Sequence, residues 1–177
     1  MEHEEKINTE KTREILFICY GNVHRSVLAE HIANKVLSVD DQYFAISRGI
    51  QGMNGYEKPK HSNLMQYEIQ WKLTKKALDE IGVDTSFFKG KVSTYVTKSQ
   101  IENAFRIIAM DKKTAEILKK EFPESENKIR LFESWIGGVD VSDCAESNDA
   151  EKHLRVNTSI VSNIRESLLS ILKKEEN

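Results

Sequence analysis

The sequence predicts a single α/β domain of three layers, in which helices cover both faces of a central four-stranded parallel sheet. Short apolar runs that are typical of buried parallel strands alternate with longer segments whose apolar residues recur at helical spacing. The chain has 177 residues, which suits one domain and is too short for two domains of typical size. A glycine-containing loop follows the first apolar run directly, where ligands bind at the carboxyl ends of parallel strands.

Composition and charge narrow the classes of function. Charged residues make up 31% of the chain and sum to a net charge of −2, which gives no support for a nucleic-acid groove or a membrane patch. No stretch approaches the roughly 18 apolar residues of a membrane span. Two cysteines make no disulfide framework, and residues 1–13 are polar and lack a signal-peptide core. We therefore expect a cytoplasmic protein with a polar N-terminal tail over residues 1–13 and a domain over residues 14–177.

The first strand, loop and helix follow one another closely. Residues 15–18 are a continuous run of β-branched, aliphatic and aromatic side chains, which predicts a strand buried on both faces. Gly21 and Asn22 adopt positive φ most easily, so the chain can turn sharply there. Ser26 is a good N-cap residue, and the apolar residues after it recur at helical spacing. A helix is predicted to begin at that serine.

The rest of the chain continues the alternation. The further predicted strands are residues 43–47, 105–110 and 129–132. The further predicted helices are residues 69–81, residues 97–103, a helix capped by Asp111, and a C-terminal helix with one apolar stripe. Between about residues 50 and 68 the chain has few apolar anchors and reads as a long loop. Loops longer than roughly 12 residues are usually functional or disordered, so this one is either a substrate-facing flap or a solvated insertion.

The loop after the first strand has the construction of an anion site. Successive backbone N–H groups that turn inward at the start of a helix form a nest for an anion such as phosphate. Cys19 and Arg25 bracket this nest. The amides, the helix dipole and the arginine favour a thiolate nucleophile at Cys19, and Arg25 can hold phosphate oxygens with two parallel hydrogen bonds.

Residues 19–26, Cys-Tyr-Gly-Asn-Val-His-Arg-Ser, resemble the phosphate-binding loop of the low-molecular-weight protein tyrosine phosphatases, whose pattern is Cys-x-Gly-Asn-x-Cys-Arg-Ser. Ala77 to Asp84 and Ala109-Met110-Asp111 extend the resemblance, which covers most of residues 14–177 apart from a loop insertion around 50–68. One departure is His24, which stands where most members carry a second cysteine. Another is the absence of the histidine that members usually have near Phe87, where this chain has Lys89 and Lys91.

The resemblance implies a role for each loop residue. Cys19 would be the nucleophile, Arg25 would hold the phosphate, and Ser26 would stabilise the thiolate. Ser47 would match a serine that braces the loop, and Asp111 would be a structural residue and helix cap. The other residues expected to bind phosphate or substrate are Tyr20, Gly21, Asn22, Val23 and His24.

The resemblance also implies a general acid between the fourth strand and the last helix, where members carry Asp-Pro-Tyr. Asp143 aligns best, Asp140 is the alternative, and both could be ordinary loop residues. Cys144 and Ala145 replace the Pro-Tyr, so an aromatic wall for the substrate would have to come from Tyr20, Tyr56 or Trp135. Cys144 is either a free thiol or the partner of Cys19 in a reversible disulfide.

The implied function is a phosphomonoester hydrolase, with protein-tyrosine phosphatase favoured, acting through a cysteinyl-phosphate intermediate. The implied partners are phosphotyrosine proteins or small aryl phosphates, with inorganic phosphate as product, and no cofactor or metal is expected. Val23 favours aryl phosphates, since the arginine phosphatases of this family tend to carry threonine there. The alternatives are a phosphate- or phosphoprotein-binding regulatory module with little turnover, an arsenate reductase and a phosphoarginine phosphatase.

Overall fold

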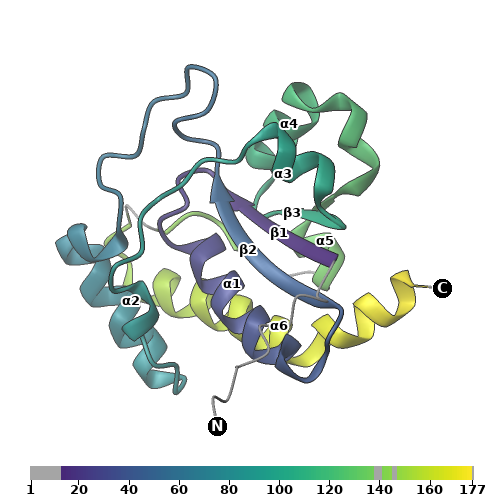
Figure 1. The fold of residues 1–177 in the computed structure, drawn as a ribbon. Helices are drawn as coiled ribbons and strands as arrows, with labels where there is room; N and C mark the ends of the chain where they lie inside the picture. Colours follow the sequence, from purple (N-terminus) through teal and green to yellow (C-terminus); the bar gives the residue numbers. More distant parts are fainter. Residues whose placement is uncertain (1–12, 138–140, 145–146, 177) are drawn as a thin grey trace, which may run out of the picture.

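The computed structural model describes residues 13–137, 141–144 and 147–176. A parallel sheet with the strand order β2-β1-β3-β4 lies at its centre (Figure 1). The strands are β1 (Arg13–Cys19), β2 (Tyr43–Gly49), β3 (Arg106–Ala109) and β4 (Ile129–Leu131). The predicted α/β fold with a four-stranded parallel sheet is confirmed.

Helices cover both faces of the sheet, as Figure 1 shows, with α3 and α4 on one side and α1 and α6 on the other. The helices are α1 (Arg25–Val36), α2 (Glu68–Glu80), α3 (Lys98–Asn103), α4 (Lys112–Glu121), α5 (Phe132–Ile136) and α6 (Ala150–Glu175). Short 3₁₀ turns lie at η1 (Leu37–Val39), η2 (Leu64–Gln66), η3 (Ser86–Phe88) and η4 (Pro123–Lys128).

The central strand β1 explains why the first apolar run is continuous. Ile15 and Phe17 belong to the core shared with α1 and α6, whereas Leu16 and Ile18 belong to the core shared with α3 and α4. Successive side chains of a strand point to opposite faces, so a strand that is covered on both faces needs apolar residues at every position. This arrangement fixes the end of β1, and therefore Cys19, at the carboxyl edge of the sheet.

Two local predictions differ from the structure. The helix after the loop begins at Arg25, one residue before the predicted cap, and His24 occupies the N-cap position. Ser26 is therefore no cap, because its hydroxyl is turned into the loop, where it contacts the sulfur of Cys19. β1 begins at Arg13, the last residue of the expected tail, and the guanidinium of Arg13 donates to the hydroxyl of Tyr43. The remainder of the expected tail lies outside the described residues.

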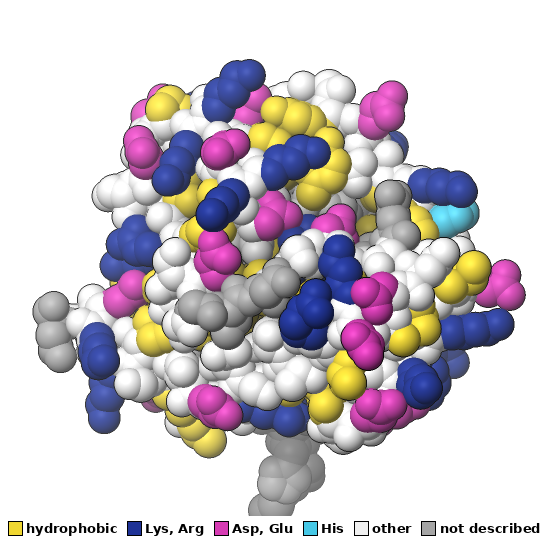
Figure 2. All heavy atoms as spheres, turned by 180° about the vertical axis from the view of Figure 1, so that it is seen from behind, with side chains coloured by type: hydrophobic (Ala, Val, Ile, Leu, Met, Phe, Trp, Pro, Cys, Tyr) yellow, Lys and Arg dark blue, Asp and Glu magenta, His cyan; other side chains and the backbone are white. Residues whose placement is uncertain are grey.

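The outer surface carries charges of both signs. Figure 2 shows lysine and arginine side chains interspersed with aspartate and glutamate over one whole face, with no broad area of a single sign. Among the described residues, no helix has the length and apolar character needed to cross a membrane.

Candidate active site

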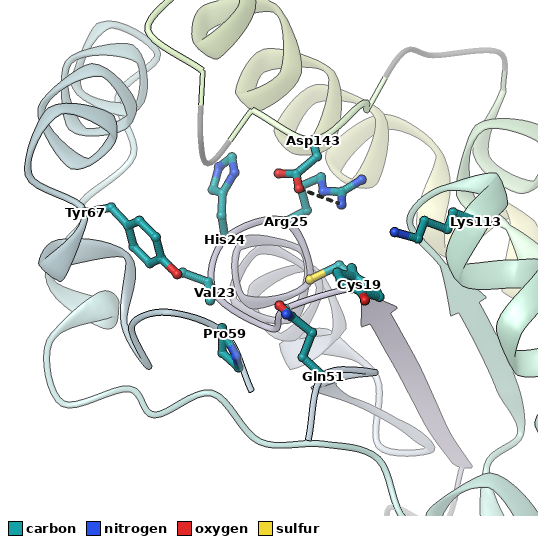
Figure 3. Close-up of a pocket in the computed structure, with 11 residues that line it drawn as sticks. Cys19, Val23, His24, Arg25, Gln51, Pro59, Tyr67, Lys113 and Asp143 are labelled. Atoms are coloured by element: carbon teal, nitrogen blue, oxygen red, sulfur yellow. Dashed lines mark ion pairs between the residues drawn. The ribbon is translucent and has the colours of Figure 1, made fainter. Parts of the chain in front are cut away.

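Residues 20–24 join β1 to α1, and the loop curls around the sulfur of Cys19 (Figure 3). Asn22 lies at the tip of the turn with a φ of 51°, the left-handed conformation that asparagine adopts more readily than most residues. Its backbone N–H donates to Cys19 Sγ at 3.2 Å. The predicted sharp turn is thus present, and it points an amide at the sulfur of Cys19.

The Asn22 side chain organises the loop from behind. Its amide Nδ2 donates to Ser26 Oγ at 2.9 Å and to Ser47 Oγ at 3.1 Å. Ser26 Oγ also lies 3.0 Å from Cys19 Sγ. Because the serine oxygen already accepts a hydrogen bond from Asn22, its own O–H group is available to donate to the sulfur. The sulfur of Cys19 therefore has two donors beside it, the Asn22 N–H and the Ser26 O–H.

The end of β2 packs closely against this loop. A Cβ added to Gly49 would lie 2.9 Å from both the backbone nitrogen and the Cβ of Asn22, closer than real Cβ atoms approach. Only glycine therefore lets the strand support the turn.

A second segment, residues 91–93, braces the loop. Lys91 Nζ pairs with Glu30 Oε2 at 2.6 Å, and Glu30 Oε1 accepts from the backbone N–H of Ser47 at 3.1 Å. Ser93 Oγ donates to the carbonyl of Gly21 at 2.6 Å. Lys91 is thus part of the support of the loop.

Arg25 is only 3% exposed and is held in place by acceptors on two other segments. Its Nη1 donates to Asp111 Oδ2 at 2.7 Å and to the carbonyl of Val141 at 3.0 Å. Asp111 also accepts from the backbone N–H of Thr114 at 2.8 Å, so it caps α4 as predicted. The carboxylate therefore aligns the guanidinium and begins a helix at the same time.

The charges around Arg25 reinforce one another. Burial opposes the charge of the guanidinium, but the negative charges of Cys19, Asp143 and Asp111 outweigh it, so the pKa of Arg25 is raised. Burial also opposes ionisation of Asp111, but the Arg25 charge and the Thr114 N–H outweigh it, so the pKa of Asp111 is lowered. Both groups are charged at neutral pH.

Asp143 lies at the mouth of the site, with Oδ2 at 3.8 Å from Arg25 Nη2 and a side chain that is 55% exposed. Figure 3 shows its carboxylate beside the guanidinium. The neighbouring Val141 and Cys144 are buried, so the segment is anchored on both sides of Asp143. Asp140, the alternative acid, lies outside the described residues.

A cavity of about 290 Å³ opens above the loop. Seven of the predicted site residues line it, namely Cys19, Tyr20, Gly21, Val23, His24, Arg25 and Asp143. Asn22, Ser26 and Ser47 do not line it, and their hydrogen bonds hold the loop in shape from behind. The sulfur and the guanidinium thus share one concave space.

Four further residues line the cavity that were not predicted as site residues, namely Gln51, Pro59, Tyr67 and Lys113. Three of these come from residues 50–67, so that part of the chain forms one wall of the cavity. Lys113 stands at the opposite rim, where its Nζ lies 4.1 Å from the ring centre of Tyr20. Tyr20 is thus the one expected aromatic residue that lines the cavity, since Tyr56 and Trp135 do not.

His24 is buried behind the loop, at 2% exposure, and is held by Asn157. Burial lowers the pKa of His24 to about 4, against the opposing effect of its hydrogen bond to Asn157. The charges of Arg25 and His153 lower the pKa further, and that of Asp143 raises it. At neutral pH the imidazole is therefore uncharged.

This shift predicts a pH dependence of stability. The pKa of His24 is 6.5 in the unfolded chain and about 4 in the folded one, so the unfolded state alone takes up the proton between these values. The folded protein should lose up to about 3 kcal/mol of unfolding free energy as the pH falls through this range, and none of this term above it. Urea unfolding of wild type and His24→Gln at several pH values measures the difference. Equal pH slopes for the two proteins would contradict the assignment.

The residues described here contain no group of three or more histidine, cysteine, aspartate or glutamate side chains that could hold a metal ion. The two cysteines are unpaired, and both are buried. The sulfur of Cys144 contacts Nδ1 of His24 at 3.5 Å.

The cavity thus brings together a thiol that accepts from a loop amide, an adjacent buried arginine and a carboxylate at the mouth. A model of the low molecular weight phosphotyrosine protein phosphatases matches residues 14–177. The chain belongs to this family, and its membership supports a phosphatase activity that depends on a cysteine nucleophile. A comparison with curated proteins finds no significant match.

Solved structures share the fold. A protein tyrosine phosphatase from Entamoeba histolytica superposes with a TM-score of 0.68 at 22% identity, covering 93% of this chain and 99% of that one. A low molecular weight phosphotyrosine phosphatase from Vibrio cholerae O395 gives a TM-score of 0.68 at 20% identity, covering 92% and 98%. The YwlE arginine phosphatase from Geobacillus stearothermophilus gives 0.67 at 20% identity, covering 93% and 95%.

Proposed function

We propose that this protein hydrolyses phosphotyrosine in proteins, or small aryl phosphates, through a cysteinyl-phosphate intermediate at Cys19. The observation that carries the proposal is that Cys19, Arg25 and Asp143 line one cavity. Arg25 interacts electrostatically with both of the other side chains, and its Nη2 lies 3.8 Å from Asp143 Oδ2. A free thiolate nucleophile requires a reducing compartment, so we place the protein in the cytoplasm.

In the first step the thiolate of Cys19 attacks the phosphorus atom, and a sulfur–phosphorus bond replaces the ester bond. Arg25 and the amides of the loop neutralise the charge on the three phosphoryl oxygens. Asp143, in its acid form, gives its proton to the departing oxygen, because an unprotonated oxyanion leaves poorly.

In the second step Asp143, now a carboxylate, takes a proton from water. The water oxygen attacks the phosphorus of the intermediate, inorganic phosphate leaves, and the thiolate of Cys19 is regenerated. These side chains supply every proton and charge that the reaction needs, and we propose no cofactor.

The walls of the cavity favour an aromatic alcohol as the leaving group. Val23, Pro59 and Tyr67 form an apolar side next to the loop (Figure 3). We propose that Tyr67 provides the aromatic wall that was expected from Tyr20, Tyr56 or Trp135. A substrate ring stacked against Tyr67 would gain both buried apolar area and a favourable ring geometry. Its hydroxyl accepts from the backbone N–H of His61 at 3.1 Å, which fixes the position of the ring.

The test is a comparison of phosphotyrosine, phosphoserine and phosphoarginine peptides with wild type, Tyr67→Ala and Tyr67→Phe. We expect wild type to prefer phosphotyrosine, and Tyr67→Ala to lower kcat/KM for that peptide by about tenfold, since an aromatic pair and its buried area contribute roughly 1 to 2 kcal/mol. Tyr67→Phe is the matched control, because it keeps the ring and removes only the hydroxyl. A loss of the same size in both variants would assign the effect to the His61 contact.

Phosphoarginine is the second candidate substrate, because one of the similar structures is titled an arginine phosphatase. Val23 favours the aryl substrate at the position where a threonine is typical of arginine phosphatases. A wild-type preference for the phosphoarginine peptide would overturn the assignment of phosphotyrosine while leaving the phosphatase mechanism in place.

A further inference from the structure

A buried chain of hydrogen bonds connects the phosphate loop to the segment that carries Asp143. It runs from α6 through Asn157 to His24, and from His24 to Cys144. All three side chains are buried. His24 and Cys144 are also two of the positions where this chain departs from the pattern of the family it resembles.

The directions of these hydrogen bonds follow from their partners. Asn157 Nδ2 donates to the carbonyl of His153 at 2.6 Å, so Asn157 Oδ1 is the acceptor that faces His24 Nε2 at 2.6 Å. The proton of the neutral imidazole is therefore on Nε2, and Nδ1 carries a lone pair. Cys144 Sγ lies 3.5 Å from Nδ1 and donates its S–H there.

The thiol of Cys144 is suited to this role. Burial raises the pKa of Cys144 to about 12, and the charge of Asp143 acts in the same direction. The sulfur thus keeps its proton at neutral pH, and it can donate a hydrogen bond without acting as a nucleophile.

We propose that His24 and Cys144 form a latch that holds residues 141–144, and with them the carboxyl group of Asp143, over the phosphate loop. This proposal rests on the proposed function and assigns Cys144 and His24 as positioning residues for its acid. The latch is the second anchor of the segment, after the bond from Arg25 Nη1 to the carbonyl of Val141. Asp143 lies between the two anchors.

A third contact holds the chain just beyond the latch. His153 Nε2 lies 2.7 Å from the carbonyl of Ser147, and His153 Nδ1 lies 2.9 Å from Thr74 Oγ1. A carbonyl can only accept, so the ring donates from Nε2 and accepts from the threonine hydroxyl. The segment is therefore tied to both α6 and the phosphate loop.

Substrates with different leaving groups distinguish a substitution that misplaces the general acid from one that disturbs the whole site. Phenyl phosphate needs a proton on its departing oxygen, whereas dinitrophenyl phosphate leaves well without one. In both cases kcat/KM reports the step that forms the cysteinyl phosphate. A latch that acts through Asp143 therefore affects the first substrate selectively.

The experiment compares wild type, Cys144→Ala and Cys144→Ser on these two substrates. We expect Cys144→Ala to lower kcat/KM about tenfold more for phenyl phosphate than for dinitrophenyl phosphate, since a misplaced catalytic group costs on the order of 10- to 100-fold. Cys144→Ser keeps a donor at the same position and should recover most of the loss. In an Asp143→Asn background, Cys144→Ala should lower the phenyl phosphate rate no further.

Each other outcome is decisive. Equal losses on the two substrates, or a further loss in the Asp143→Asn background, would mean that Cys144 supports the site only by packing, and would overturn the latch. Thermal melting identifies any variant that fails to fold, in which case the Cys144→Ser comparison carries the test. Absence of hydrolysis by wild type would instead refute the proposed function itself.

Discussion

Replacing Cys19 with serine is expected to lower the hydrolysis of phosphotyrosine peptides by on the order of 10⁴-fold or more. The serine hydroxyl stays protonated at neutral pH, and the contacts from the Asn22 N–H and Ser26 Oγ are arranged for a sulfur anion. The measurement is kcat/KM for the peptide with the purified variant.

Phosphate binding provides the control for this variant. Arg25 and the loop amides remain in Cys19→Ser, so titration calorimetry with inorganic phosphate should still detect binding. Turnover that persists in the variant would exclude Cys19 as the nucleophile. Phosphate binding by a wild type that shows no turnover would favour the regulatory module over the enzyme.

Replacing Asp143 with asparagine should lower kcat for phosphotyrosine peptides by roughly 10²- to 10⁴-fold, the usual contribution of a positioned general acid. The substitution keeps the size of the side chain and removes the proton that the leaving oxygen needs. It also removes the negative charge 3.8 Å from Arg25 Nη2, so phosphate should bind no less tightly.

Asp140→Asn is the matched control for the acid. Asp140 was the alternative from the sequence, it has the same chemistry, and it precedes Asp143 by three residues. If Asp140→Asn caused the larger loss, the general acid would be Asp140. The proposal that His24 and Cys144 position the acid through Asp143 would then be wrong.

The sequence predicted the parts of the site that depend on neighbouring residues. β1 could be located because both of its faces are buried, and the loop because Asn22 permits its turn. Gly21, the other residue expected to favour positive φ, does not adopt it. Cys19 and Arg25 are brought together by that single loop, so their proximity follows from local structure alone. Asp111 could be assigned as a cap for the same reason.

The missed features all depend on contacts between distant segments. Tyr67 reaches the cavity only because residues 50–67 fold back over the loop. Lys91 contacts Glu30, which is 61 residues away in the sequence, and Cys144 contacts His24, which is 120 residues away. A serine hydroxyl can either cap a helix or donate a hydrogen bond to a sulfur atom. Only the three-dimensional structure shows that Ser26 contacts the sulfur of Cys19. Lys113 could have been anticipated, since it follows Asp111 by two residues at the same edge of the sheet.

The proposed mechanism requires that Cys19 carries the phosphoryl group during turnover. The measurement is acid quenching of Asp143→Asn during hydrolysis of dinitrophenyl phosphate, followed by mass spectrometry of the peptide that contains Cys19. This substrate forms the intermediate without a proton from Asp143, whereas the loss of the base slows breakdown of the intermediate. We expect to find phosphate bound to the sulfur of Cys19. Continued turnover with that sulfur unmodified at every time point would contradict it.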